Sequence, residues 1–207
     1  MPTLTDVDGN TYNTVQIGEQ CWMKENLRTT KKPNGTSISS GIWTPGSNSV
    51  TTYGRLYSWS TVMNGASSSN SNPSGVQGIC PDGWHVPSDA EWTQLTDYVS
   101  SQSAYCCSGN TSNIAKALAS TTGWNSSSTT CAVGNTPSSN NATGFSALPV
   151  GAYDGCFNNS GDYAYFWSAT SDNTNYAWYR YFSNGNEGVG RYYTNKNYGF
   201  SVRCLRD

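Results

Sequence analysis

The sequence predicts an α+β fold made of small antiparallel sheets, two helices and long irregular loops. Three observations support this class: one strong helix signal near the middle of the chain, short apolar runs that recur between Gly and Asn residues, and long stretches of small polar residues. No segment repeats at a fixed period, which excludes solenoids and propellers. At 207 residues the chain predicts a single domain, residues 1–207, with a sizeable core.

The first third of the chain predicts hairpin strands and loops. Asp8-Gly9-Asn10 is a turn signal, and Thr14-Val15-Gln16-Ile17 alternates in the manner of a half-buried strand. Residues 31–52 and 64–78 are rich in Ser, Asn, Gly, Thr and Pro, which bury too little apolar surface to form a core. We expect both stretches to be surface loops that flank Leu56-Tyr57-Ser58-Trp59.

The strongest helix signal begins at Ser88. Its hydroxyl can cap the backbone amide of Glu91, and the Glu91 side chain can reach back, which is a capping box. Three large apolar residues follow on one helical face, at i, i+3 and i+7: Trp92, Leu95 and Val99. The pattern predicts a helix over residues 89–99 that packs on a sheet, and a second, shorter helix over residues 113–119.

Further strands are predicted in the last third of the chain. Short apolar runs recur there between Gly and Asn residues, at 145–150, 166–169, 177–182 and 200–204. These runs are typical of the strands of a compact antiparallel sheet.

The composition excludes two classes of partner. With 11 Lys and Arg and a formal net charge of −2, the chain has no basic stripe for phosphate groups, so nucleic acid is excluded. No run approaches the roughly 18 apolar residues of a membrane span, so membrane insertion is excluded as well. A charged fraction of 12%, half of the roughly 25% of an average domain, together with many Trp, Tyr, Ser and Asn, is typical of an extracellular or virion-exposed protein.

No signal peptide is visible at the start of the chain, Met1-Pro2-Thr3-Leu4-Thr5, which lacks the basic and apolar regions of such a leader. A trimmed leader, a longer parent protein and release of a phage particle by lysis all remain open as routes to the exterior.

Seven cysteines are an odd number, so at least one thiol is free or pairs outside the chain. None sits in a CxxC pair, and His85 is the only histidine, which disfavours a structural zinc site. Wide separations in a polar chain favour scattered disulfides over free buried thiols and leave the pairing open. The cysteines are Cys21, Cys80, Cys106, Cys107, Cys131, Cys156 and Cys204.

Three motifs taken together resemble the Fibrobacter succinogenes major paralogous domain. They are Gln20-Cys21-Trp22-Met23-Lys24-Glu25-Asn26-Leu27, Cys80-Pro81-Asp82-Gly83-Trp84-His85-Val86-Pro87-Ser88 and Gly199-Phe200-Ser201-Val202-Arg203-Cys204. The resemblance implies a C-type-lectin-like fold of the group that includes the formylglycine-generating enzyme. The Leu-Pro-Thr-x-x-Glu-Trp helix start of that enzyme is similar to Val86-Pro87-Ser88-Asp89-Ala90-Glu91-Trp92.

A narrower resemblance is to the variable proteins of diversity-generating retroelements. Those proteins end in Trp-Ser-(Ala/Ser)-Thr, an Asn- and Tyr-rich variable stretch and Gly-Phe-Ser-Val-Arg-Cys, and both borders match here, at 167–170 and 199–204. Randomised adenines turn Asn codons into Asn, Tyr, Ser, Thr, Asp and Gly in those systems. The resemblance implies a diversified protein for receptor recognition, with a variable ligand-binding region at residues 171–198.

The residue types of this region suit binding. Tyr supplies a large contact area with only two torsions to freeze, and Asn supplies adaptable hydrogen bonds, as in antibody paratopes. Half-buried packing of the tyrosines in a sheet is the structural alternative. The predicted ligand-binding residues are Asn173, Asn175, Tyr176, Tyr179, Tyr181, Asn184, Asn186, Tyr192, Tyr193, Asn195, Asn197 and Tyr198.

Strand alternation assigns faces to the run 177–182. Trp178 and Phe182 fall on one face, which we expect to be core, and Tyr179 and Tyr181 fall on the other. A loop at 184–190 would bring Tyr192 and Tyr193 back alongside, so that these tyrosines and Tyr176 share one exposed face.

Catalysis and metal binding are not expected. His85 has no evident nucleophile beside it, and we interpret it as structural. The pair Cys106-Cys107 resembles the redox cysteines of the formylglycine-generating enzyme. The C-terminal active-site cysteines of that enzyme, however, have no counterpart motif in this sequence. Asp6-Val7-Asp8-Gly9-Asn10 resembles half of a calcium loop without its bidentate Glu, so calcium is only the weaker alternative to a hairpin turn.

The sequence thus predicts a binding protein with no catalytic residue and no cofactor. We expect its partner to be a protein or a cell-surface ligand, and its location to be extracellular, on a bacterial surface or a phage virion. A non-variable adhesion or structural module is the alternative function, and an oxidoreductase of the formylglycine-generating type is a more distant one.

Overall fold

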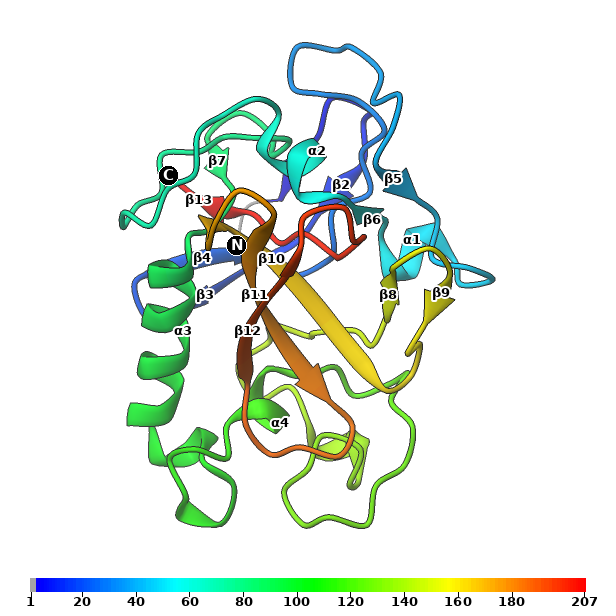
Figure 1. Cartoon of the computed structure of the whole chain (residues 1–207). Coiled ribbons are helices and arrows are strands. Elements are labelled where there is room, and N and C mark those ends of the chain that lie inside the picture. The colour runs from blue at the N-terminus through cyan, green and yellow to red at the C-terminus, as the bar shows by residue number, and fades with distance from the viewer. Residues whose placement is uncertain (1–2) are drawn as a thin grey trace.

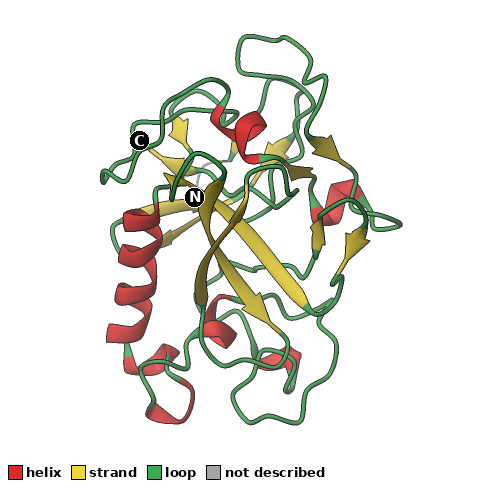
Figure 2. Cartoon of the chain, in the orientation of Figure 1, coloured by secondary structure: helices red, strands yellow, loops and turns green. Residues whose placement is uncertain are grey.

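The computed structural model describes residues 3–207 and confirms the α+β class, with small antiparallel sheets and few helices. Figure 2 shows that loops connect most of these short elements. The strands are β1 (Leu4–Thr5), β2 (Thr11–Tyr12), β3 (Thr14–Ile17), β4 (Gln20–Met23), β5 (Ile42–Trp43), β6 (Leu56–Tyr57), β7 (Trp84–His85), β8 (Ala152–Tyr153), β9 (Phe157–Asn158), β10 (Tyr163–Ser171), β11 (Tyr176–Ser183), β12 (Gly190–Asn195) and β13 (Leu205–Arg206). The α-helices within residues 3–207 are α1 (Val50–Tyr53), α2 (Trp59–Met63), α3 (Asp89–Ser101) and α4 (Ala115–Leu118), and 3-10 turns lie at Ser103–Tyr105, Cys107–Gly109 and Pro137–Ser139.

The N-terminal hairpin turn confirms the turn predicted at Asp8-Gly9-Asn10. Strands β1 and β2 pair in antiparallel fashion on either side of it. The Asp6 carboxylate closes the turn, because it accepts hydrogen bonds from the backbone N–H groups of Asp8 and Asn10 and from the Tyr12 hydroxyl. The following residues form the predicted strand β3, which pairs with β4. The acidic residues of this segment therefore have a structural role in the turn.

Helix α3 begins where the sequence predicts it. The Ser88 hydroxyl accepts from the Glu91 N–H at 3.1 Å, and a Glu91 carboxylate oxygen accepts from the Ser88 N–H at 2.8 Å, so the capping box is present. The helix runs past the predicted end to Ser101. It lies against strands β10 and β11 with its predicted apolar face buried: Trp92, Leu95 and Val99. This contact ties the helix to the central sheet (Figure 1).

The prediction of two helices is wrong in number. Helices α1 and α2 were not predicted, and the helix expected at 113–119 is reduced to α4. The start of α2 carries a local signal, because the Ser58 hydroxyl caps the N–H of Thr61. Its length of five residues is too short for apolar periodicity to be recognised.

The strand predicted at 145–150 is also wrong. Ser146 has a φ of 60°, outside the range of a strand, and only Ala147 forms an isolated bridge, with Ala119. The segment still contributes the buried Phe145 to the core. At 200–204 the chain makes isolated bridges, and the regular strand β13 begins only at Leu205.

The three-stranded sheet β10-β11-β12 lies at the centre of the molecule (Figure 1). It contains the predicted strand segments 166–169 and 177–182, and the loop between β11 and β12 lies within the predicted 184–190. Strand β11 is central between the outer strands β10 and β12, and the register of β10 against β11 shifts after Trp167. A separate four-stranded sheet has the order β3-β4-β13-β7.

Two hydrophobic clusters lie on opposite faces of the sheet. Trp167 on β10 and Ala177 on β11 belong to one cluster, whereas Phe166 on β10 and Phe182 on β11 belong to the other. Successive strand residues point to opposite faces, so β10 and β11 supply side chains to both cores. Because their side chains are buried on both faces of the sheet, β10 and β11 are held firmly in place. These two strands carry most of the candidate ligand-binding surface.

Two disulfides cross-link the chain, as the composition favoured. Cys80 bonds to Cys204 and Cys107 bonds to Cys131. The other three cysteines are Cys21, Cys106 and Cys156. Disulfides are typical of proteins outside the reducing cytosol. Within residues 3–207 no helix is long and apolar enough to cross a membrane.

Candidate ligand-binding surface

Five tyrosines line a shallow hollow of about 430 Å³ on the sheet β10-β11-β12. Strand alternation sends their side chains to the same face, because they occupy alternate positions on β10 and β11 and a matching position on β12. Two asparagines complete the rim. We call this surface the tyrosine basin: Tyr163, Tyr165, Tyr179, Tyr181 and Tyr192, with Asn159 and Asn186.

The rings of the tyrosine basin support one another. Tyr163 and Tyr165 stack in parallel, with centroids 5.4 Å apart. Tyr165 also stacks on the buried Phe200 at 4.8 Å, and Tyr179 contacts Phe200 edge to face at 4.9 Å. Tyr181 lies within 6.4 Å of Tyr165. The base of the basin is therefore held by the core, and little side-chain entropy remains to be lost on binding.

Burial raises the pKa of two phenol groups in the basin. It raises the pKa of Tyr179 to about 12, with a further contribution from the neighbouring tyrosines. Burial also raises the pKa of Tyr165 well above its ordinary value. Both hydroxyls are therefore protonated at neutral pH, when each can donate and accept a hydrogen bond.

The opposite face of the sheet shows that Trp178 is not core, which corrects the prediction from strand alternation. Its ring is only half-buried, and the guanidinium of Arg191 lies 3.6 Å from the ring centroid. Tyr193 meets the same ring edge to face at 5.2 Å. Phe182, on the same face of β11, is fully buried as predicted. A cation, not an apolar layer, thus lies over Trp178.

Arg180 and Arg191 are bound to the first turn of α3 on this opposite face. They are cross-strand partners, and both donate to the carboxylate of Asp89 at 2.8 Å. Arg180 also donates to the hydroxyl of Thr93. The charges on this side of the sheet are therefore paired within the chain.

The structure divides the twelve predicted binding residues among three places. Four of them line the tyrosine basin: Tyr179, Tyr181, Asn186 and Tyr192. Tyr176 and Tyr193 lie outside this hollow; their centroids are 5.9 Å apart, and Tyr193 stacks on the basin residue Tyr192 at 5.0 Å and also contacts Trp178. The remaining six lie at the turns that end the strands: Asn173, Asn175, Asn184, Asn195, Asn197 and Tyr198.

Three residues of the tyrosine basin precede the predicted ligand-binding region, residues 171–198: Asn159, Tyr163 and Tyr165. They were not predicted, because the border motifs delimit a region, 171–198, that begins after them. The spacing Tyr163-Ala164-Tyr165 could have revealed two of them, since a period of two places both rings on one face of a strand. Three of the seven basin residues thus lie outside that segment.

The border motif at 167–170 is buried scaffold. The indole N–H of Trp167 donates to the Tyr57 carbonyl at 2.8 Å, and the indole N–H of Trp59 donates to the Ser168 carbonyl at 2.9 Å. The Thr170 hydroxyl accepts from the Asp89 N–H at the start of α3. These bonds attach β10 to two helices.

The second border motif, at 199–204, is scaffold too. A Cβ on Gly199 would lie 2.8 Å from the Trp43 ring, so the close approach needs glycine. Phe200 supports the basin rings, Arg203 is fully buried, and Cys204 forms the disulfide with Cys80. The exposed tyrosines and asparagines lie between two fixed ends.

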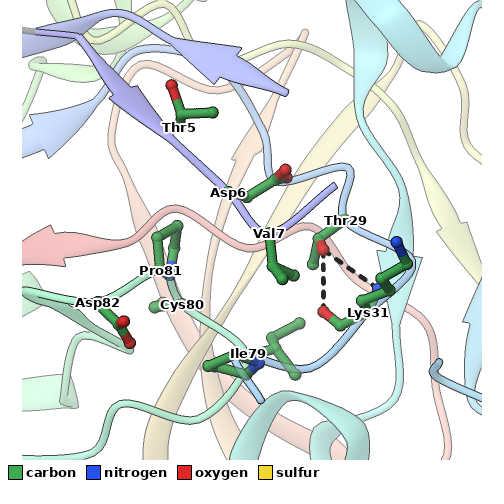
Figure 3. A pocket seen from close by; sticks show the side chains of 10 residues that line it. Thr5, Asp6, Val7, Thr29, Lys31, Ile79, Cys80, Pro81 and Asp82 are labelled. Atoms are coloured by element: carbon green, nitrogen blue, oxygen red, sulfur yellow. Dashed lines mark hydrogen bonds between the residues drawn. The ribbon is translucent and has the colours of Figure 1, made fainter. Parts of the chain in front are cut away.

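A second hollow, of about 250 Å³, lies between the N-terminal hairpin turn and the loop before β7 (Figure 3). Its charged side chains already have partners. Asp6 closes the hairpin turn, Asp82 accepts from Gln77 at 2.7 Å, and Lys31 pairs with Asp8 at 3.3 Å. The charged groups of this hollow are therefore engaged within the chain.

His85 is buried between two carboxylates. Its Nε2 lies 2.8 Å from Oε1 of Glu91, and its Nδ1 lies 2.6 Å from Oδ1 of Asp207. Burial alone lowers the pKa of His85, but the hydrogen bonds and charges of both carboxylates outweigh burial and raise the pKa above its ordinary value. The three residues tie α3 to the C-terminal strand.

The vicinal cysteines do not bond to each other. Cys107 forms a disulfide with Cys131, and the buried Cys106 thiol donates to the Ser100 carbonyl at 3.3 Å. Within the described residues 3–207, no three His, Cys, Asp or Glu side chains gather as a metal site.

The fold and the surface define a disulfide-bonded α+β domain that presents an uncharged, tyrosine-lined hollow on an antiparallel sheet. Residues 15–206 match the Fibrobacter succinogenes major domain, and the chain belongs to this family. The family resemblance carried by the three sequence motifs is thereby confirmed. No curated protein and no solved structure shows a significant match to the chain.

Proposed function

We propose that the chain is a diversified ligand-binding protein: a variable protein of a diversity-generating retroelement, with a C-type-lectin-like fold. Its ligand-binding region is residues 171–198, extended by the three basin residues on the preceding loop and on β10. The recognised ligand is a protein or another molecule on a cell surface. The protein acts outside the cell, on a bacterial surface or a phage virion.

One observation carries this proposal. Both border motifs are buried and bonded to the scaffold, whereas the segment between them exposes Tyr and Asn. Tyr192 is 57% exposed and Tyr176 is 40% exposed, large values for aromatic side chains. Exposed aromatic side chains gathered on one part of a surface mark an interaction site. A fixed frame around exposed contact residues is the arrangement that diversification requires.

The DNA around the coding sequence provides the test. We expect a reverse-transcriptase gene and a near-copy of the segment that encodes residues 171–198, differing from it only where the copy has adenine. Independent isolates should then differ in the exposed residues of this segment and agree at both border motifs. A locus without such a copy would overturn diversification.

A fixed surface-adhesion module is the second candidate. The observation that favours it is that Tyr163 and Tyr165, outside the segment, supply part of the basin. In that case isolates would keep the same tyrosines in 171–198, and no near-copy would accompany the gene.

We propose no enzymatic activity. The pairing of Cys107 with Cys131 supports this reading, because it leaves no vicinal dithiol for redox chemistry. Mass spectrometry of a cysteine-containing peptide, after incubation with the chain, copper and oxygen, tests the point. Conversion of the cysteine to formylglycine would establish an oxidoreductase instead.

A further inference from the structure

The tyrosine basin presents aromatic faces without a charged side chain. All seven of its lining residues are Tyr or Asn, and five of them carry a ring. The face of an aromatic ring is electrostatically negative, so a group of rings attracts a cation that reaches their faces. An attraction of this kind does not depend on any carboxylate.

On the opposite face of the same sheet, cations of the chain itself lie over aromatic rings. There the guanidinium of Arg191 lies over Trp178, and a carboxylate oxygen of Asp89 accepts its Nε–H. Lys196 likewise lies 4.3 Å from the ring centroid of Trp59, at the end of the sheet. Each of these indole rings has a cation from the chain itself. The rings of the basin have none among the described residues.

We propose that the tyrosine basin binds an arginine side chain of a protein partner. This inference rests on the proposed binding function and names the chemistry of its ligand. A guanidinium is planar, weakly hydrated and able to stack on a tyrosine face, which an ammonium group does less well. Arginine is also enriched among the residues that dominate binding energy at protein interfaces.

Hydrogen-bond acceptors at the basin rim favour a guanidinium over a quaternary ammonium group. The side-chain oxygens of Asn186 and Asn159 accept no hydrogen bond within residues 3–207, and the Asn159 amide, which donates to the Tyr165 hydroxyl at 3.3 Å, fixes the direction of its own side chain. The neutral phenol oxygens add further acceptors. A guanidinium has five N–H donors that match such a rim, whereas a quaternary ammonium has none.

The basin is rigid enough to hold a stacked cation. Tyr165 and Tyr179 rest on Phe200, and the ring of Tyr181 lies over the backbone of Gly190. The pocket is thus formed before a ligand arrives, which reduces the entropy lost on binding.

The experiment is a titration of the full chain with N-acetyl-arginine methylamide, followed by NMR of the tyrosine rings. The matched probe is N-acetyl-citrulline methylamide, which has the same shape without the charge. We expect shifts of the basin rings and binding of the arginine probe at least about fivefold tighter than of the citrulline probe. Equal binding, or binding of neither probe, would overturn the proposal.

Three variants and a third probe make the result specific. Tyr181→Leu should abolish the preference for arginine, and Tyr181→Phe should keep most of it, because the ring and not the hydroxyl attracts the cation. Tyr98→Leu, an exposed tyrosine on α3 outside the site, should leave the preference unchanged. Tetramethylammonium that binds as tightly as the arginine probe would contradict the assignment to arginine.

Failure of this inference is separable from failure of the proposed function. The probe titration tests only the chemistry of the ligand, and the near-copy in the neighbouring DNA tests diversification. If the locus were a retroelement and the chain bound the arginine and citrulline probes equally, the proposed binding function would stand. The assignment of arginine as the ligand would then be rejected.

Discussion

The ring of Tyr181 lies directly over the backbone of Gly190, its cross-strand partner on β12. A Cβ added to Gly190 would lie 2.1 Å from the nearest ring carbon of Tyr181, far inside van der Waals contact. Glycine at this position is therefore what allows the ring to lie flat on the strand and form one wall of the tyrosine basin.

We predict that Gly190→Ala displaces the Tyr181 ring and lowers the free energy of unfolding by about 1–3 kcal/mol, the usual range for overpacking. Urea denaturation measures the loss, and NMR shifts of the basin rings report the displacement. Gly185→Ala is the matched control, because nothing lies within 4 Å of the added Cβ and a change within about 0.5 kcal/mol is expected. Equal effects of the two variants would contradict the packing described for Tyr181.

His85 gives a stability that depends on pH. Its pKa is raised in the folded state by Glu91 and Asp207, although burial opposes the shift. A raised pKa means that the contribution is fully present below the ordinary pKa of about 6.5 and is lost as the pH rises through the folded-state value. We predict that His85→Gln costs more stability at pH 5.5 than at pH 9, measured by urea denaturation. A cost that grows toward high pH would show that the ring is neutral in the folded protein.

The two disulfides should differ in their contribution to stability. Cys80 and Cys204 are 124 residues apart, and Cys107 and Cys131 are 24 apart. Loop-closure entropy then gives about 5 kcal/mol for the first bond and about 3.5 kcal/mol for the second. We predict a larger loss of unfolding free energy for the Cys80→Ala, Cys204→Ala pair than for Cys107→Ala, Cys131→Ala. The reverse order would mean that the unfolded chain retains structure across the longer loop.

Arg203 is a fully buried cation that fixes the last border motif. Its guanidinium donates to Asn26 and to the carbonyl groups of Phe145 and Ser146, and burial lowers the pKa of Arg203 to about 9. We predict that Arg203→Lys costs about 3 kcal/mol or more, because one ammonium cannot reach all of these acceptors. The control Arg206→Lys, at an exposed position, should change stability by less than about 0.5 kcal/mol in the same denaturation assay.

Local chemistry made the helix α3 predictable. The capping box at Ser88 and Glu91 and the apolar face that follows are properties of neighbouring residues, and both are present in the structure. The hairpin turn before Thr11 was predictable for the same reason. Segment 145–150 was not, because its apolar composition says nothing of the positive φ at Ser146 that breaks the strand.

The candidate site was predictable only in part. The alternation of a strand tells which side chains share a face of the sheet, but it does not tell which groups pack over that face. It correctly separated Tyr179 and Tyr181 from Phe182. It did not reveal that Arg191, on the next strand β12, lies over Trp178 in place of an apolar layer. Partners brought together by the sheet register decide which face is core, and a single sequence does not show them.

The anchoring of both border motifs has an evolutionary consequence. Trp167 and Arg203 are fixed by bonds to parts of the chain outside the segment that they enclose. Substitution of the exposed side chains between them removes few contacts on which folding depends. Under the proposed binding function, selection for a new partner acts on those positions with little counter-selection for stability, and specificity then evolves faster than architecture.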